Sequence, residues 1–416
     1  MVSVQTYGEM LKQLRQCARL SLRALAAEAY SDHTHLSHLE NGRGRGSKDL
    51  AQRLDTALNA QGGLVAAYTS SQRRGDKPST AGIQAASVIT ELAMSAEESA
   101  RFLRRGTYSV DETTIEQLTD DVQHLAIRFL DEPPLVVAQS LTQRRRDLFD
   151  LLDQRQRPQY LADLYSLAGY VCAMLAHACA DLHSRYAAET HARTALLLAD
   201  YASDSRLTGY VRWCQAQTAH WAGDHQRAAK YARAGLDIAA APQDILRLAS
   251  QQARAYAAEG NHRDAENALT TAQGAFEQLD QLDAPHGVLS FDAGKASYYA
   301  GEAYNALGNH NQGLTHATRA LEIFDQTNPC PEFTAAAHAV AAKAHLGLGD
   351  LDGSRDAINP VLALPVELRT QPITSRIARI SDQLLRNETQ QAQELREEIG
   401  LFSAYTAATE IANIEE

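Results

Sequence analysis

The sequence has few cysteines and few runs of β-branched residues, and both shortages narrow the classes of protein it can belong to. Its five cysteines, Cys17, Cys172, Cys179, Cys214 and Cys330, are odd in number and include no CxxC pair. This pattern indicates neither a disulfide framework nor a zinc site. With only 11 prolines and few β-branched runs, the chain is typical of a helical protein and leaves little room for a sheet.

Long hydrophobic runs and catalytic motifs are also missing. No segment approaches the roughly 18 uncharged apolar residues that span a bilayer, and the N-terminus lacks the apolar core of a signal peptide. The sequence contains no phosphate-cradling glycine loop, no nucleophile elbow and no HExxH. We therefore expect a cytoplasmic protein that is neither membrane-bound nor an enzyme and that holds no cofactor.

What the chain does contain is helix-forming residues and an uneven distribution of charge. Alanine, leucine, glutamine and arginine abound, and a length of 416 residues is typical of two or three structural units. The net charge is −12, yet residues 1–78 hold 11 basic and 7 acidic residues, which leaves this part four charges positive. The acidity belongs to residues 79–416, so the sequence predicts an all-α protein with a basic head that faces DNA.

The first 60 residues predict a compact bundle of five short helices. Apolar spacing and capping residues place four of the five over Gly8–Arg19, Leu22–Ala29, His33–Glu40 and Asp49–Leu58. Ser21 and Asp32 precede the second and third of these as N-caps. In the third, Leu36 and Leu39 are expected to pack inward.

These residues resemble the XRE-type (phage-repressor and Cro-like) helix-turn-helix family. The resemblance lies in Gly8-x-x-Leu11-x-x-Leu14-Arg15, Ser21-Leu22-x-x-Leu25-Ala26 and Leu36-Ser37-x-Leu39-Glu40-x-Gly42-Arg43, and it covers about residues 5–65. Two positions depart from the family pattern, because Tyr30 stands where a glycine is usual and Ser31 where an apolar residue is usual. Since tyrosine at positive φ costs about 1 kcal/mol or more, we expect a longer or differently shaped turn.

The resemblance implies that the third helix lies in the major groove of double-stranded DNA. It assigns base contacts to its outward residues, which are His33, Thr34, His35, Ser37 and His38. It assigns phosphate contacts to nearby cations, which are Arg23, Arg43, Arg45 and Lys48. Such heads read two half-sites, which predicts a homodimer. The pair His35 and His38 could instead suggest a metal, but the sequence positions no further ligand.

Residues 1–69 are thus predicted as the DNA-binding domain and residues 70–81, with Gly75 and Pro78, as a linker. Residues 82–159 are predicted as a helical connecting region and residues 160–416 as a repeat domain for sensing and dimerisation. The basic run Gln143–Asp147 is expected to form salt bridges rather than a second DNA contact.

Beyond residue 160 the chain repeats a Gly-Asp or Gly-Asn turn followed five residues later by a small residue. The instances are Gly223 with Ala228, Gly260 with Ala265, Gly308 with Gly313, and Gly349 with Ser354, while His183 with Ala188 forms an earlier unit without the glycine. Small residues also recur seven positions before the turns, at Ala216, Ala253, Gly301 and Ala342. Over about residues 160–365 this pattern resembles the tetratricopeptide repeat, which implies a right-handed α-solenoid whose first helices form the inner wall.

The repeat register places polar, aromatic and cationic side chains on that wall. They are Tyr170, His177, Tyr210, Trp213, Gln217, His220, Arg247, Arg254, Lys295, Tyr298, Glu302, Asn305 and Lys343. Such a wall suits a signalling peptide or an acidic small molecule. Core packing is the alternative for Trp213 and Tyr298, whereas Arg247, Arg254 and Lys343 cannot be buried unpaired.

Together the two halves resemble peptide-responsive quorum-sensing regulators. The sequence therefore predicts a transcription regulator whose repeat domain binds a signal and controls operator binding. The alternative is an interaction scaffold whose repeats bind a partner protein and whose head docks it on DNA.

Overall fold

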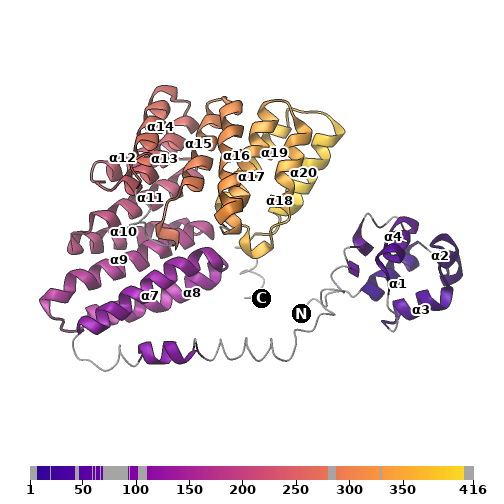
Figure 1. Ribbon diagram of the computed structural model, residues 1–416, viewed down its shortest axis with the longest axis horizontal. Coiled ribbons are helices and arrows are strands. Elements are labelled where there is room, and N and C mark those ends of the chain that lie inside the picture. Colours follow the sequence, from indigo (N-terminus) through magenta and orange to yellow (C-terminus); the bar gives the residue numbers. More distant parts are fainter. Residues whose placement is uncertain are drawn as a thin grey trace. The chain divides into compact units, whose positions relative to one another are not determined.

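The computed structural model is all-helical and divides into two compact units, Met1–Ser99 and Ala100–Glu416 (Figure 1). It describes residues 7–18, 20–42, 46–58, 60, 62–65, 67, 68, 92, 94–101, 110–279, 287–327 and 330–406. The predicted linker and the ends of the chain lie outside this range.

The N-terminal unit contains α1 (Tyr7–Cys17), α2 (Leu22–Glu28), α3 (His33–Glu40) and α4 (Lys48–Ala57), followed by helical residues 63–65, 67 and 68. The predicted caps are confirmed. Ser21 Oγ accepts a hydrogen bond from Ala24 N at 3.1 Å, and Asp32 Oδ1 accepts from Thr34 N at 2.8 Å. The inward positions predicted for Leu36 and Leu39 are confirmed too, because both are buried in one cluster with Leu11, Leu25, Leu50 and Leu54. The spacing of apolar residues thus fixes how the short helices pack.

The turn between α2 and α3 differs from our expectation. Tyr30 adopts φ +49°, so it takes the left-handed conformation that glycine usually supplies, and the turn is not rebuilt around it. The amide of Ser31 donates to Ala26 O at 2.9 Å and that of Tyr30 to Ala27 O at 3.4 Å, which is a Schellman motif. Arg53 Nη1 on α4 also donates to the carbonyls of Ala29 and Tyr30, at 3.0 and 2.9 Å. These hydrogen bonds fix the turn and keep Tyr30 in a left-handed conformation that a tyrosine would otherwise avoid.

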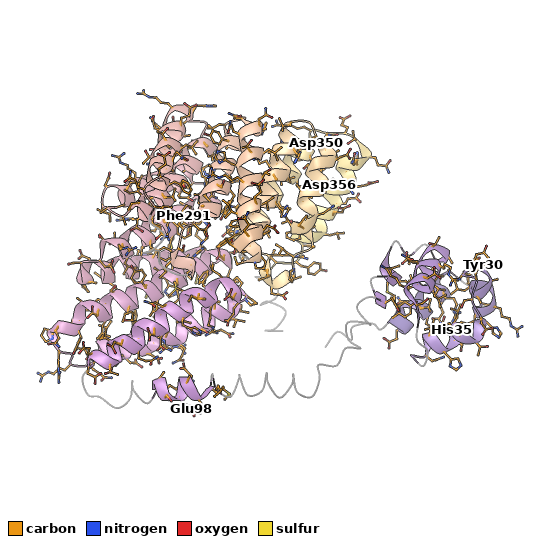
Figure 2. All side chains as sticks on the ribbon, viewed as in Figure 1. Tyr30, His35, Glu98, Phe291, Asp350 and Asp356 are labelled. Carbon is orange, nitrogen blue, oxygen red and sulfur yellow. The ribbon has the colours of Figure 1, made fainter. Side chains whose placement is uncertain are left out.

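We expect Tyr30→Gly to stabilise the N-terminal unit by about 1 kcal/mol, because glycine reaches positive φ without the steric cost that tyrosine carries. The Tyr30 side chain is 84% exposed, so its removal uncovers little (Figure 2). In native-state hydrogen exchange, amides of α2 and α3 should exchange about fivefold more slowly. Faster exchange in the variant would show that the ring, rather than the backbone, stabilises this turn.

The second unit is a series of helix pairs that follow one another along the chain (Figure 1). The bounds are α7 Glu112–Asp131, α8 Pro134–Leu152, α9 Pro158–Asp181, α10 Arg185–Ala202, α11 Ser205–Trp221, α12 His225–Leu236, α13 Pro242–Ala258, α14 His262–Phe276, α15 Ala293–Ala306, α16 His310–Thr327, α17 Pro331–Gly347, α18 Leu351–Leu362, α19 Gln371–Leu384 and α20 Gln390–Ser403, with short 3₁₀ turns η2 at Gly287–Leu289 and η3 at Val366–Leu368. The arrangement is that of a repeat solenoid.

The repeated Gly-Asp and Gly-Asn turns join the two helices of a pair, as predicted. The four turn glycines have φ between +74° and +80°, and His183, at the unit without a glycine, has φ +61°. The residue that follows each glycine caps the next helix, as when Asp224 Oδ1 accepts from Arg227 N at 3.1 Å. The predicted small residues are buried where the paired helices approach, and a Cβ on Gly301 would lie 3.0 Å from the Gly313 carbonyl oxygen.

The first helices of successive pairs form the inner layer of the solenoid. Each of α9, α11, α13, α15, α17 and α19 packs against the next in this series. The last of them, α19, also packs against α9 and α11, so the inner layer closes on itself. The side chains of this layer therefore face a common interior.

One sequence expectation needs correction at α9. Pro158–Asp181 is long and apolar enough to span a membrane, although we expected no such segment; 61% of its most apolar window is buried in the unit. This helix is a core helix, because the neighbouring helices cover its apolar side chains. The basic run behaves as predicted, since Arg144 Nη1 lies 3.2 Å from Asp121 Oδ2 and 3.3 Å from Asp147 Oδ2.

Candidate functional site

The helix α3 presents a polar surface at the edge of the N-terminal unit. Leu36 and Leu39 anchor it in the core, which leaves His33, Thr34 and His38 exposed and His35 and Ser37 half-buried. Figure 2 shows His35 on this helix. All of the predicted base-contacting residues therefore have side chains that reach solvent from one short helix.

Both ends of α3 are fixed. At its N-terminus Asp32 accepts from the amides of Thr34 and His35, and these bonds, that from His35 first, lower the pKa of its carboxyl group. At its C-terminus Glu40 forms a two-point ion pair with Arg15 of α1, with Nε–Oε1 at 2.6 Å and Nη2–Oε2 at 2.8 Å. The ion pair between the motif residues Arg15 and Glu40 thus holds α3, which carries the polar surface, against α1.

Of the predicted phosphate contacts, Arg23 in the first turn of α2 and Lys48 at the start of α4 are exposed. Arg43 and Arg45 lie outside the described residues. His35 and His38 belong to no metal-binding group, because the described part of the chain contains no set of three or more His, Cys, Asp or Glu arranged to hold a metal ion.

The predicted inner-wall residues all lie on the first helices α9, α11, α13, α15 and α17, but they do not line an open groove. Tyr170, His177 and Lys343 are half-buried and the other ten are buried. The expectation that Arg247 and Arg254 stay out of the core is wrong. Arg254 is 1% exposed and Arg247 3%; Arg254 Nε lies 3.1 Å from Glu302 Oε2, whereas Arg247 donates to the Leu289 carbonyl.

Glu302 on α15 is the acidic centre of a buried cluster of arginines. Its Oε2 lies 3.1 Å from Arg254 Nε and 3.0 Å from Arg376 Nη2, and its Oε1 lies 3.8 Å from Arg379 Nη1. Burial would raise the pKa of Glu302, but the charges of Arg254 and Arg376 outweigh it and hold this pKa well below 4.5. Because Arg376 and Arg379 come from α19, the cluster joins the last inner helix to the middle of the solenoid.

Hydrogen bonds and aromatic rings complete this cluster. Arg254 Nη1 donates to Gln251 Oε1 at 2.9 Å and to Gln217 Oε1 at 3.1 Å, and its guanidinium carbon lies 4.0 Å from the Tyr299 ring centroid. His220 Nε2 lies 3.8 Å from Glu302 Oε1. Burial first, and the charge of Arg254 second, lower the pKa of His220 to about 3, so this imidazole is neutral at physiological pH.

Beside the cluster, the inner helices enclose a cavity of about 50 Å³. Six predicted wall residues line it, namely His177, Trp213, Gln217, Arg247, Lys295 and Tyr298. Others do not. Asn305, for example, ties α15 to α17 by donating from Nδ2 to the Val340 carbonyl at 2.9 Å, and Tyr170 and Lys343 lie apart from the cavity.

Several lining residues were missed by sequence reasoning. Asp181 lies one turn after His177 on the same face of α9, and this i, i+4 spacing could have revealed it. Glu332 lies in the first turn of α17. Arg376 lies on α19, beyond the last Gly-Asp turn, so the repeat pattern did not reach it. Phe291 precedes α15 in the long connection after α14 (Figure 2).

Comparison with known proteins identifies a family for the N-terminal unit. A family model described as a helix-turn-helix domain matches residues 6–68. No curated protein matches the sequence. The chain therefore consists of an N-terminal helix-turn-helix domain followed by a long all-helical region of stacked helix pairs.

Proposed function

We propose that the protein is a cytoplasmic transcription regulator that binds double-stranded DNA through α3 and senses a signal in its helical unit. The observation that carries the proposal is the surface of α3, where exposed polar side chains extend from a helix anchored at both ends. A helix of this kind in a helix-turn-helix domain enters the major groove with its N-terminal half. The positive balance of residues 1–78 supports contact with phosphates.

The assigned roles separate into base readers and phosphate contacts. We propose His33, Thr34, His35, Ser37 and His38 as the readers, since serine and threonine bond to several bases and the Thr34 methyl suits thymine. We propose Arg23, Arg43, Arg45 and Lys48 as phosphate contacts. Two half-sites about one helical turn apart would be read by a homodimer, whose linked heads gain affinity through effective concentration.

This division predicts two different mutant phenotypes with the full-length protein. Thr34→Ala and His35→Ala should relax preference at particular bases, by about 1–3 kcal/mol for a good contact. Arg23→Ala and Lys48→Ala should weaken binding to all sequences alike and reduce the slope of log affinity against log salt by about 1 per contact. The measurement is selection of sequences from a random duplex pool, followed by binding titrations at several salt concentrations.

Arg386→Ala serves as the control, because Arg386 is an exposed cation of the helical unit and its loss should change neither quantity. Equal losses on selected and random DNA for both pairs of variants would contradict the division. A full-length protein that selects no sequence would contradict the proposed function itself and would favour the scaffold alternative.

The proposed sensor role is supported by the cavity and by its position. Its lining comes from the adjoining ends of α7 and α8, from every inner helix from α9 to α19, and from the segments that precede α15, α17 and α19. A ligand there contacts early and late repeats together, so it can favour one closure of the solenoid over another. Coupling of this kind to DNA binding typically changes affinity by about 1–3 kcal/mol.

A further inference from the structure

Two carboxyl groups that line the cavity have no lysine or arginine nitrogen within 4.0 Å among the described residues. Asp181 is 2% exposed, its Oδ1 has no hydrogen-bond partner, and its Oδ2 lies 3.6 Å from His177 Nε2. Burial lowers the pKa of His177 to about 3, so this imidazole is neutral and supplies no charge. Glu332 accepts from Thr370 Oγ1, at 3.1 Å. Burial raises the pKa of both carboxyl groups, and the neighbouring Glu332 adds to the rise at Asp181.

The same cavity is lined by two buried cations that have no carboxylate partner. Lys295 is 5% exposed, and its Nζ donates to the Ser290 carbonyl at 2.9 Å and lies 4.2 Å from the Phe333 ring centroid. Arg247 donates to the Leu289 carbonyl and lies among the rings of Tyr210, Trp213 and Phe291. Within the described residues, no carboxylate oxygen comes within 4.0 Å of either cation.

Three buried ionisable groups, Asp181, Arg247 and Lys295, and the half-buried Glu332 therefore surround one cavity, and among the described residues none of them has a group of opposite charge within 4.0 Å. A buried charge without a partner is costly, and here the unpaired groups include both carboxyl groups and cations. An anion alone would neutralise Arg247 and Lys295 but not the two carboxylates, and an amine alone would do the reverse. A ligand that carries both charges satisfies all four groups.

We propose that this cavity binds a small zwitterion, an amino acid whose ammonium group is held by Asp181 and Glu332 and whose carboxylate is held by Arg247 and Lys295. The inference rests on the proposed sensor role and names its class of ligand. Trp213 Nε1 is buried without an acceptor and supplies one further donor for the carboxylate.

The size of the cavity favours a small amino acid over an extended peptide. Its volume of about 50 Å³ holds about four groups of the size of water. The wall next to it is occupied by the paired side chains of Arg254, Glu302 and Arg376, which take up space that a longer chain would need.

The test uses the full-length protein, in which both tryptophans, Trp213 and Trp221, lie in the helical unit. Urea unfolding followed by tryptophan fluorescence is measured with glycine, L-alanine, β-alanine or γ-aminobutyrate, and with propionate or ethylamine at the same concentration. A zwitterion should shift the midpoint to higher urea, because a ligand of the native state stabilises it by mass action. Propionate and ethylamine should give no shift.

Variants of the two ends of the cavity test how the ligand is held. By calorimetric titration, Asp181→Asn and Lys295→Met should each weaken zwitterion binding at least about tenfold, since each leaves one ligand charge buried without its partner. Both variants remove a buried charge that lacks a partner, so the fold should tolerate them. Asp264→Asn is the control, because this half-buried carboxylate accepts from Asn261 Nδ2 at 2.8 Å and does not line the cavity.

The inference is overturned if none of the four zwitterions shifts the midpoint, if propionate or ethylamine shifts it equally, or if both cavity variants bind with wild-type affinity. DNA selection is measured in parallel without any amino acid. Selected DNA without zwitterion binding refutes the ligand class and leaves DNA recognition standing. Zwitterion binding that is lost in both variants, together with unchanged DNA affinity, supports the site and refutes the sensor role.

Discussion

Replacing Glu302 by glutamine should destabilise the helical unit by about 3–5 kcal/mol, because it leaves buried arginines without their counter-charge. Arg254 and Arg376 are 1% and 6% exposed, and Glu302 is the only carboxylate within ion-pair distance of either among the described residues. An amide at this position keeps the shape of the side chain. The loss of stability in this variant therefore measures the effect of the missing charge rather than a change in packing.

The pH dependence of this effect follows from the lowered pKa of Glu302. A carboxylate whose folded pKa lies below its unfolded value contributes stability that is fully present above the unfolded pKa and is lost as pH falls through the folded one. The stability difference between wild type and Glu302→Gln should therefore be constant from neutral pH down to about 5 and shrink below about pH 4.5.

Urea unfolding of the full-length protein, followed by tryptophan fluorescence, measures the difference, because Trp213 and Trp221 are the only tryptophans of the chain. Glu322→Gln on α16 removes an exposed carboxylate and should change stability by no more than about 0.5 kcal/mol. Adding Arg376→Met to Glu302→Gln should restore part of the loss, since one unpaired charge fewer remains. A Glu302→Gln protein as stable as wild type would show that solvent reaches the cluster.

The repeated turns could be predicted from the sequence because their chemistry is local. A glycine at positive φ followed by a capping Asp or Asn is a property of adjacent residues, and Gly223, Gly260 and Gly349 all behave accordingly. The register derived from them placed Trp213, Arg247 and Lys295 correctly on the inner helices.

The interior of the solenoid could not be predicted in the same way. Whether a wall residue faces a groove or a closed core depends on how far the helices curve, and that is set by contacts between distant pairs. Arg376 reaches Glu302 across 74 residues of sequence, and α19 packs on α9. No local sequence pattern predicts such a contact. For this reason Arg247 and Arg254 were expected at a surface but are found in the interior.

The head shows the same division between local and distant effects. Its caps and apolar spacing were predicted correctly, and so were the outward side chains of α3. The conformation of Tyr30 was not, because the carbonyls of this turn are held by Arg53 from α4. A distant arginine thus allows tyrosine at a position where local energetics favour glycine.

In the head, Glu40→Ala should destabilise the fold by about 3 kcal/mol or more, because it leaves the guanidinium of Arg15 largely buried without its carboxylate. The side chains of Arg15 and Glu40 are 13% and 4% exposed, and both oxygens of Glu40 are engaged. Among the described residues, Arg15 would keep its bond from Nη1 to the Leu20 carbonyl, at 2.9 Å, and no carboxylate partner. A domain of about 60 residues has only a few kcal/mol of stability in total, so this loss should unfold a large fraction of the heads.

The expected result is loss of DNA binding together with rapid hydrogen exchange in α1 and α3, while the tryptophan unfolding transition of the helical unit stays where it is. Glu28→Ala removes an exposed carboxylate from α2 and should retain DNA binding. Arg15→Met combined with Glu40→Met should recover part of the stability, since replacing both members of a buried ion pair by apolar side chains is often close to neutral. If Glu40→Ala binds DNA as wild type does, the ion pair is not what holds α3 to α1, and the packing of Leu36 and Leu39 against Leu11 is sufficient on its own.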